Sequence, residues 1–326
     1  MDGTHSACFR PEARPRIVTL TMNPAVDLAC TAASVRPTHK IRTFDERFDP
    51  GGGGINVARV AHALGGDSRA LILTGGVTGR LVEELLDEGG VLWQAIPIRG
   101  RTRISLNVQE QATGLEYRFV PEGPTIEESE WQAALATLAS VEAEWIVASG
   151  SLPPGVPVDF YAQAAAVAGR RGQSFALDTS GPALHTAVGQ GVALLKLSLG
   201  ELEYLIGRNA RTAQDQEAEV TALLRGKAAR MIAVSLGAEG AIFGHGDAII
   251  RLSSPAIEAR SAVGAGDSFL AGLVLGLGQG MSDRDALALG IAAGTTAVLS
   301  YGTALVSRDD VAALFEQISR AEPVAL

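Results

Sequence analysis

Short apolar runs alternate with longer amphipathic segments along most of the chain. Residues 16–22, RIVTLTM, form an apolar run that Asn23 and Pro24 end, which is the pattern of a buried first strand. Strand and helix patterns then follow in pairs at 70–74 and 79–88, 144–149 and 160–168, 174–177 and 183–188, and 193–197 and 201–206. A strand at 231–235 leads into a β-rich return through 241–252, and 266–318 is predicted helical with a break near 301–302. This alternation predicts an α/β fold in which helices cover both faces of a mostly parallel sheet.

Two segments depart from this alternation and predict a small β-strand lid. Residues 28–48 contain short alternating stretches, and residues 102–120 contain two strand patterns on either side of Ala112-Thr113-Gly114, a good hairpin signal. We expect the two segments to pair with each other, away from the main sheet. Since no linker or repeat divides the chain, we expect one domain over 16–320, preceded by a loose polar tail at 1–15.

Composition and charge narrow the class of protein. Hydrophobic residues make up 47% of the chain but aromatic residues only 5%, so the core must consist mostly of Ala, Val, Leu and Ile, which favours buried strands and helices over a β-sandwich. The net charge of −9, with no basic stripe, argues against a nucleic-acid partner. Cys8 and Cys30 have no metal-ligand spacing. No apolar run is long enough to span a membrane, so we expect a cytoplasmic protein without a membrane partner.

The strongest candidate for chemistry is Val263-Gly-Ala-Gly-Asp-Ser-Phe269, which runs directly into a helix of small residues. Gly264 and Gly266 allow a tight turn, and the helix behind them directs unpaired N–H groups and a positive dipole end at a ligand. Asp267 beside this anion hole is placed to accept a proton from a hydroxyl during phosphoryl transfer. A capped helix with an acidic first turn would show the same residues.

A second glycine-rich turn, Gly51 to Gly54, also enters a helix. Four consecutive glycines cost conformational entropy on folding, so we expect them to permit close approach to a small ligand. Asn56 would offer that ligand both donors and acceptors. The alternative is a flexible loop.

Three further turns follow apolar strands, at the sheet edge where ligands bind in parallel sheets. They are Ser149-Gly-Ser-Leu-Pro-Pro-Gly155, Lys196-Leu-Ser-Leu-Gly-Glu201 and Ser235-Leu-Gly-Ala-Glu-Gly240. Lys196 and Glu201 could neutralise phosphates and hold Mg²⁺ through water. Each could equally be an ordinary turn or, for Glu201, an acidic first turn of a helix.

Together, in this order and spacing, the turns at 51–59, 149–155, 234–237 and 263–268 resemble the signatures of the ribokinase-like PfkB carbohydrate kinase family over roughly residues 16–320. The Walker-type phosphate loop is absent. The unbroken glycine run and Glu116-Tyr-Arg-Phe-Val120 most resemble the 6-phosphofructokinase branch, whose near relatives are 1-phosphofructokinases and tagatose-6-phosphate kinases. The resemblance implies a ribokinase-like fold and ATP-dependent, Mg²⁺-dependent phosphorylation of a ketohexose phosphate, with fructose 6-phosphate to fructose 1,6-bisphosphate as the expected reaction.

Carried over position by position, the resemblance also implies roles for individual residues. Asp267 would be the base and Gly264, Ala265 and Gly266 the anion hole; Asp27, Gly52, Gly53, Asn56 and Ser151 would hold the sugar, and Lys40 and Arg103 its phosphate. ATP would lie along Lys196, Ser198, Ser235, Gly237, Gly240 and Thr295, with Glu201 organising Mg²⁺. Backbone oxygens of Ser261, Val263, Ala297, Ser300 and Gly302 would bind a monovalent cation such as K⁺.

Two positions depart from the family pattern and leave alternatives open. Ser198 stands where the family usually has Asn, so we expect weakened rather than lost metal organisation. Ala262 stands where Thr is frequent. A different phosphorylated or free sugar, or a catalytically silent sugar or nucleotide sensor, remains possible on the same fold. The exposed strand edges of the lid also predict a homodimer through it.

Overall fold

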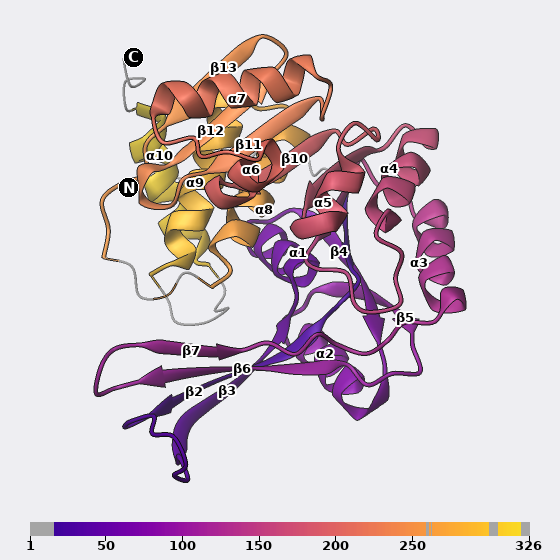
Figure 1. Cartoon of the computed structure of the whole chain (residues 1–326), viewed down its shortest axis with the longest axis vertical. Coiled ribbons are helices and arrows are strands. Elements are labelled where there is room, and N and C mark those ends of the chain that lie inside the picture. The colour runs from indigo at the N-terminus through magenta and orange to yellow at the C-terminus, as the bar shows by residue number, and fades with distance from the viewer. Residues whose placement is uncertain (1–15, 259–260, 262, 300–305, 321–326) are drawn as a thin grey trace, which may run out of the picture.

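A large, mostly parallel sheet forms the centre of the molecule (Figure 1). The structure is a computed structural model that describes residues 16–258, 261, 263–299 and 306–320. Within them, nine strands lie in the order β13-β12-β11-β10-β9-β8-β1-β4-β5. These are β1 (Arg16–Thr21), β4 (Asp67–Thr74), β5 (Leu92–Pro97), β8 (Trp145–Ser149), β9 (Ser174–Asp178), β10 (Leu194–Ser198), β11 (Met231–Ser235), β12 (Ala241–His245) and β13 (Ala248–Leu252). The pairs from β5 to β11 are parallel, and β12 and β13 add antiparallel, which confirms the predicted α/β class.

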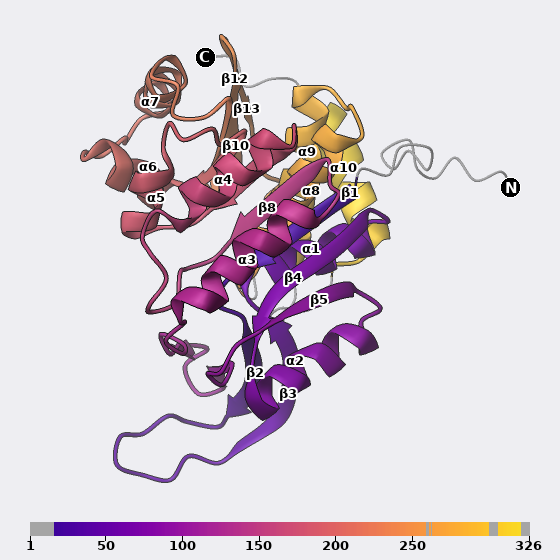
Figure 2. The ribbon, with the colours of Figure 1, turned by 90° about the vertical axis from the view of Figure 1, so that its right-hand side faces the viewer.

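Helices cover both faces of this sheet, as Figure 2 shows from the side. One face packs against α3 (Glu128–Ser140), α4 (Phe160–Arg170), α5 (Gly181–Ala187), α6 (Leu199–Ile206) and α7 (Ala213–Arg225). The other packs against α1 (Gly53–Ala63), α2 (Gly76–Glu88), α8 (Ala265–Gly278), α9 (Asp283–Ala297) and α10 (Arg308–Arg320). In β8, Ile146 faces the first layer and Val147 the second, and both are fully buried. Apolar runs without polar alternation therefore marked strands buried on both faces.

The small-residue composition lets α8 and α9 pack closely. A Cβ atom on Gly272 of α8 would lie 2.6 Å from the carbonyl oxygen of Leu289 in α9, so only glycine fits at this contact. The predicted helical stretch from 266 to 318 consists of three helices in the described residues, and the predicted break at 301–302 lies outside them. No helix among the described residues is long and apolar enough to cross a membrane.

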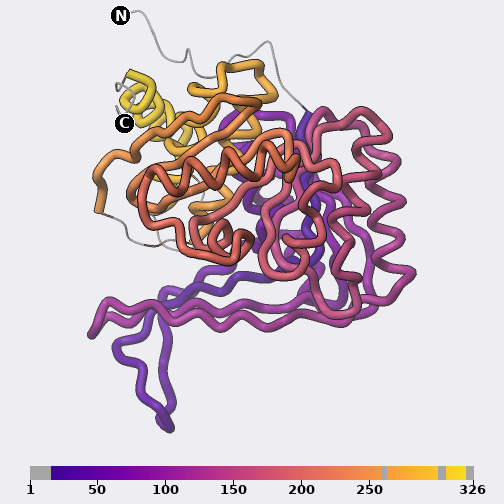
Figure 3. The backbone as a smooth tube through the Cα atoms, turned by 45° about the horizontal axis from the view of Figure 1, so that its top comes forward, coloured from indigo at the N-terminus to yellow at the C-terminus, as the bar shows by residue number. Residues whose placement is uncertain are grey.

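A four-stranded sheet projects from this body (Figure 3). It comprises β2 (Ala25–Ala32), β3 (Thr43–Gly51), β6 (Arg103–Glu110) and β7 (Glu116–Phe119), in the order β3-β2-β6-β7. β2 and β6 run parallel, with Asp27 opposite Ser105, and β6 and β7 form the predicted hairpin. The two segments that depart from the strand and helix alternation therefore pair in one small sheet, as predicted. The short segments between β1 and β2, and from β3 to α1, place this sheet beside the carboxyl ends of the central strands.

Candidate active site

The first turn of α8 presents Asp267 at the carboxyl edge of the central sheet. Gly264, the N-cap, has φ 76°, a left-handed conformation that glycine adopts without strain. The Ser268 N–H makes the first helical hydrogen bond, to the Gly264 carbonyl at 2.9 Å, so the N–H groups of residues 265–267 have no partner within the helix. The predicted anion hole, Gly264 to Gly266, overlaps these N–H groups, and the carboxylate of Asp267 is attached to the same turn.

Two side chains from other elements fix the Asp267 carboxylate. The Asn56 Nδ2 in α1 donates to Oδ2 at 2.9 Å, and the Ser149 Oγ at the end of β8 donates to Oδ1 at 3.0 Å. Burial, followed by the nearby Asp178, raises the pKa of Asp267 to about 6, against the lowering effects of the Asn56 hydrogen bond, Lys196 and the Ser149 hydrogen bond. A carboxylate with a pKa close to neutral is well suited to take a proton.

The glycines from Gly51 to Gly54 lie in close contact with other parts of the protein, where a side chain would not fit. A Cβ on Gly51 would lie 2.2 Å from the Asp27 carboxyl group, one on Gly53 2.2 Å from Ser149 Oγ, and one on Gly54 2.7 Å from the carbonyl oxygen of Leu20. We expected these glycines to allow close approach to a ligand; the close approach is between α1 and the strand ends. Gly52 and Gly53 also line the pocket described next, because the helix is drawn in so tightly.

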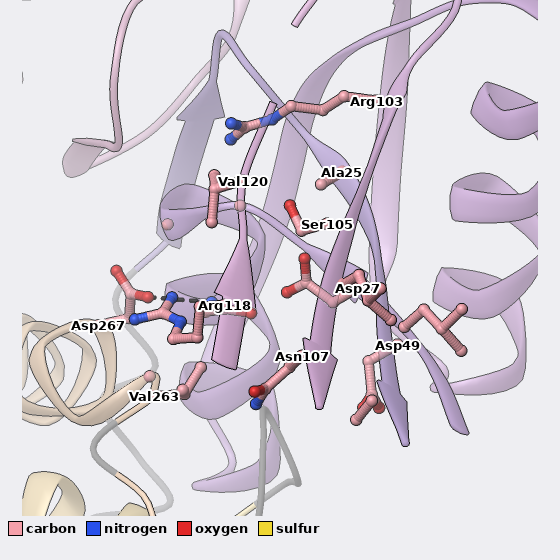
Figure 4. Close-up of a pocket in the computed structure, with 17 residues that line it drawn as sticks. Ala25, Asp27, Asp49, Arg103, Ser105, Asn107, Arg118, Val120, Val263 and Asp267 are labelled. Atoms are coloured by element: carbon pink, nitrogen blue, oxygen red, sulfur yellow. Dashed lines mark hydrogen bonds between the residues drawn. The ribbon is translucent and has the colours of Figure 1, made fainter. Parts of the chain in front are cut away.

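A polar pocket of about 200 Å³ lies between the small sheet and the start of α8 (Figure 4). Its lining includes Ala25, Asp27, Leu28, Ala29, Asp49, Gly52, Gly53, Asn56, Arg103, Ser105, Leu106, Asn107, Arg118, Val120, Val263, Gly264 and Asp267. Burial is the main cause that raises the pKa of Asp27 to about 6; Asp49 also raises it, and Arg103, Arg118 and Arg59 hold it down. The pocket therefore holds two carboxylates of raised pKa on opposite walls, Asp27 in β2 and Asp267 in α8.

Arg103 and Arg118 bring the cationic charge to this pocket. Arg103 donates through Nη1 to the Pro121 carbonyl at 2.8 Å and through Nη2 to the Asn23 carbonyl at 2.9 Å. Its Nε is buried without a partner among the described residues, so the group is oriented but keeps donors for a ligand. Arg118 was not predicted. Arg118 pairs with Asn107 across β6 and β7, so its side chain lies on the face of the small sheet that lines the pocket.

Two predicted sugar-site residues lie elsewhere. Lys40 is exposed in the connection between β2 and β3 and does not line the pocket. We expected it on a lid strand that converges with Arg103, but the strand ends at Ala32, so Lys40 lies beyond the paired region. Ser151 lines a neighbouring cavity that shares Arg103 with the pocket, and accepts a hydrogen bond from Asn23 Nδ2 at 3.4 Å.

A second, mostly apolar cavity of about 530 Å³ adjoins the other side of the anion hole. Its lining contains Ser235, Gly237, Ala238, Gly240, Ser254, Pro255, Ala256, Ile257, Ala265, Gly266, Phe269, Ile291, Gly294, Thr295 and Val298. Four residues predicted to bind ATP thus come together here: Ser235, Gly237, Gly240 and Thr295. Ala265 and Gly266 of the anion hole line the same cavity. An apolar cavity with a few polar groups beside a helix N-terminus suits a nucleotide, whose base is flat and whose phosphates are anionic.

Lys196 lies next to the anion hole. Its Nζ pairs with the Asp178 carboxylate at 3.0 Å, and a Cβ on Gly266 would lie 2.9 Å from this Nζ. Burial lowers the pKa of Lys196, but Asp178, Glu201 and Asp267 outweigh this and raise it. The lysine is therefore a fixed positive charge beside the N–H groups of α8.

Ser198 and Glu201 form a capping box at the start of α6. Ser198 Oγ accepts from the Glu201 N–H at 3.2 Å, and Glu201 Oε2 accepts from the Ser198 N–H at 2.7 Å. This is the acidic first turn that we named as the alternative. A helix cap and a Mg²⁺ ligand are compatible roles for Glu201, because its Oε1 remains outside the capping box. Its charge also acts on both Asp178 and Lys196.

Three of the five predicted monovalent-cation ligands lie in the described residues. Ser261, Val263 and Ala297 come from the turn before α8 and the end of α9, and the Ser261 N–H donates to the Val298 carbonyl at 3.4 Å. Ser300, Gly302 and the divergent Ala262 lie outside the described residues.

Ser149, Asp178 and Arg118 are the principal site residues that the sequence did not single out. Ser149 and Asp178 are each the last residue of a parallel strand, a position that already marks a ligand-binding edge. Arg118 could have been found from strand alternation, since it lies opposite Asn107 in the hairpin register.

Carboxylate, anion hole and lysine meet between a polar pocket and an apolar cavity, and this arrangement on a mostly parallel sheet defines an α/β phosphotransferase. A model of the pfkB family carbohydrate kinases matches residues 20–310. The chain belongs to this family, and it is a kinase that acts on a sugar hydroxyl.

Named relatives fall in the phosphofructokinase branch. The ATP-dependent 6-phosphofructokinase isozyme 2 of Mycobacterium tuberculosis is 45% identical over 307 residues, which cover 94% of this chain and 90% of the relative. Solved structures of phosphofructokinase-2 from Escherichia coli, one in complex with potassium and one with fructose-6-phosphate, have TM-scores of 0.90 and 0.89. They are 34% and 33% identical, and each comparison covers 94% of this chain and 100% of that chain. A tetrameric inhibited form of the same E. coli protein matches with a TM-score of 0.89 at 34% identity and the same coverage.

The raised pKa of Asp267 predicts that Asp267→Asn stabilises the fold at pH 8. An acid whose pKa is higher in the folded protein than in the unfolded chain lowers stability when it is ionised. This cost shrinks as the pH falls through the folded pKa of about 6, and it is gone only below the ordinary value of 3.8. The neutral amide removes the cost, so Tm should exceed that of the wild type at pH 8 by more than at pH 5.

Differential scanning calorimetry at the two pH values checks this. Asp247→Asn, in the exposed turn between β12 and β13, is the matched control and should leave Tm unchanged. An Asp267→Asn variant less stable than the wild type at pH 8 would contradict the assigned pKa.

Proposed function

We propose that this chain is an ATP-dependent kinase of a ketohexose phosphate, and that it converts fructose 6-phosphate to fructose 1,6-bisphosphate. The observation that carries the proposal is the position of Asp267, which faces a polar pocket on one side and shares its helix turn with a nucleotide-sized cavity on the other. A hydroxyl in the pocket and a terminal phosphoryl group at the anion hole would be in line across this turn.

In the proposed mechanism Asp267 accepts the proton of the attacking sugar hydroxyl. Asn56 and Ser149 fix its carboxylate, so the base is oriented before the substrate binds. The N–H groups of Ala265, Gly266 and Asp267, together with Lys196, stabilise the charge on the transferred phosphoryl group, and Gly264 supplies the left-handed turn that precedes them. The protein thus contributes position and charge rather than a covalent intermediate.

The sugar hydroxyls would be bound by Asp27, Asn56, Gly52 and Gly53, with Ser151 at the margin. Asn56 donates to Asp267 through Nδ2, and its Oδ1 is buried without a partner among the described residues. A buried acceptor of this kind costs free energy unless a ligand or water donates to it. The amide therefore fits a sugar hydroxyl directly beside the base.

The substrate phosphate would be met by Arg103 and Arg118, on neighbouring strands of the small sheet. A phosphate of about two negative charges needs cations in an otherwise acidic chain, and arginine can hold it through two N–H groups. Lys40 would take part only from another copy of the chain or after movement of its connection, since it lies outside this pocket.

Glu201 is the residue we assign to Mg²⁺. No group of three or more His, Cys, Asp or Glu residues in the described part of the chain could hold a metal ion by itself. Glu201 has one carboxylate oxygen outside its capping box, and Mg²⁺ usually keeps several waters and is held together with substrate phosphates. The residues fit such a site: Mg²⁺ would neutralise the ATP phosphates while Ser198 and Lys196 position them. Backbone oxygens at Ser261, Val263 and Ala297 would bind K⁺, and the hydrogen bond from the Ser261 N–H to the Val298 carbonyl brings these two segments together.

Other substrates on the same machinery are the alternatives. Fructose 1-phosphate would place a different hydroxyl at Asp267, whereas tagatose 6-phosphate would present the same hydroxyl and differ only in the configuration at one ring carbon. A silent sensor is disfavoured because a sensor has no need for a fixed carboxylate of raised pKa at an anion hole.

The direct test is ADP release with a panel of ketohexose phosphates and free sugars. We expect fructose 6-phosphate to give the highest kcat/KM, and Arg103→Ala to raise its KM at least about tenfold, as the loss of a charge-assisted hydrogen bond of ~1.5 to 3 kcal/mol implies, with the KM for ATP nearly unchanged. Arg99→Ala, an exposed arginine whose Nη1 pairs with Glu127 on the surface, is the control. A preference for free fructose or ribose, or an unchanged KM in Arg103→Ala, would reject a phosphosugar substrate.

We also propose that the small sheet forms a homodimer. Its directly paired residues Phe48, Leu28, Leu106 and Phe119 form an apolar row across all four strands. Phe48, Phe119 and nearby Ile104 are 46%, 56% and 44% exposed. Side chains of this size in one exposed patch mark an interaction surface, and a second copy would also cover the strand edges.

Light scattering on the wild type should give at least a dimer, and Phe48→Asp with Phe119→Asp should shift it towards monomer without loss of secondary structure. A wild-type monomer at micromolar concentration would contradict this interface.

A further inference from the structure

Glu116, the first residue of β7, joins the small sheet to the segment that leads into the anion hole. Its Oε1 accepts a hydrogen bond from Asn107 Nδ2 of β6 at 2.5 Å and one from Ser261 Oγ at 3.3 Å. Ser261 lies in the connection between β13 and α8 and is 5% exposed. One carboxylate oxygen therefore bridges two parts of the fold that are 145 residues apart in sequence.

The Ser261 hydroxyl also bonds to the turn that precedes α8, and so it links Glu116 to that turn. It donates to Glu116 and accepts from the Val263 N–H at 3.3 Å. Because a hydroxyl has a single proton, donation to the carboxylate leaves its lone pairs free for Val263. Val263 precedes Gly264, the N-cap of α8, and both residues line the polar pocket.

At the other end, Asn107 connects Glu116 to the pocket. It is half-buried, lines the same polar pocket as Asp27 and Asp267, and lies at its margin in Figure 4. Its Nδ2 is committed to Glu116, and its Oδ1 is buried without a partner among the described residues. A ligand or water that donates to Oδ1 would satisfy the remaining hydrogen-bond acceptor of the Asn107 amide and keep its Nδ2 directed at Glu116.

We propose that Glu116 is a positioning residue for the kinase reaction: through Asn107 on one side and Ser261 on the other, it couples the sugar pocket of the small sheet to the Val263–Gly264 turn. Glu116 touches neither substrate nor the transferred group. It holds the turn in the geometry that directs the first N–H groups of α8 at the phosphoryl group. The effect of Glu116 on the reaction rate rests on the proposed function, whereas its hydrogen bonds to Asn107 and Ser261 do not.

Hydrogen exchange tests the contact without any substrate. In Glu116→Ala the Ser261 hydroxyl loses its acceptor and turns away from Val263. Exchange of the Val263 amide, followed in the peptide spanning 256–264, should therefore rise about fivefold, the factor expected for one ordinary hydrogen bond. Ser261→Ala should give the same increase, and the double variant no more than either single one, since both act through one contact. Glu116→Gln keeps an acceptor oxygen and should largely restore protection.

Glu46→Ala is the matched control, because Glu46 is an exposed carboxylate on the same sheet that accepts a local hydrogen bond from Thr43 Oγ1 at 2.9 Å. It should leave exchange at 256–264 unchanged. Unchanged exchange in both Glu116→Ala and Ser261→Ala, or additive increases in the double variant, would overturn the coupling. Circular dichroism establishes whether each variant is folded. If Glu116→Ala does not fold, the two single variants Glu116→Gln and Ser261→Ala carry the test.

Kinetics then tests the positioning role. In Glu116→Ala, kcat should fall about fivefold while the KM for ATP changes less than twofold, the loss should be shared with Ser261→Ala, and Glu116→Gln should recover most of it. If the contact is present by exchange but kcat is unaffected, the positioning role is wrong. If the wild type itself does not phosphorylate fructose 6-phosphate, the proposed function fails, while the exchange result stands on its own.

Discussion

The structure depends on keeping a buried carboxylate at a helix N-terminus in a fixed orientation. Asp267 lies in α8, but the groups that fix it are Asn56 in α1 and Ser149 at the end of β8. They reach it only because α1 packs directly against the strand ends, which requires glycine at positions 53 and 54. The orientation of Asp267 thus depends on the position of α1, and the position of α1 depends on the glycine run.

Charge balance at the site follows from the same geometry. Burial raises the pKa of both Asp27 and Asp267 to about 6, each beside a second carboxylate, Asp49 or Asp178. Each pair of acids has its own cations: Arg59 contacts Asp49 at 3.4 Å, and Lys196 contacts Asp178 at 3.0 Å. Removal of one partner of such a pair leaves an uncompensated buried charge, which is costly. The site is therefore two coupled clusters, one around the sugar pocket and one around the anion hole.

Much of this could be predicted from the sequence, and the reasons for success and failure are local. Strands buried on both faces appear as short apolar runs, so the alternation of strands and helices along the chain followed from periodicity, although β5 and α3 were not predicted. The turn at Gly264 to Asp267 carries its chemistry within a few residues and was located directly. Lys40 was misplaced because strand ends are poorly marked in sequence. Ser149 meets a partner 118 residues away in sequence, and Arg118 lies opposite Asn107 on a neighbouring strand. A strand end and strand alternation mark these two positions, but only the folded chain shows which groups lie beside them.

The measurement that tests the central claim most directly is the pH dependence of kcat/KM for fructose 6-phosphate in the wild type. In the proposed mechanism the free enzyme needs both Asp27 and Asp267 ionised, one to accept from a sugar hydroxyl and one to take the proton, and both have a pKa of about 6. Since kcat/KM reports the essential groups of the free enzyme, log kcat/KM should fall below pH 6 with a slope approaching two. A rate that stays level from pH 7 down to pH 5 would contradict the assignment of these two carboxylates.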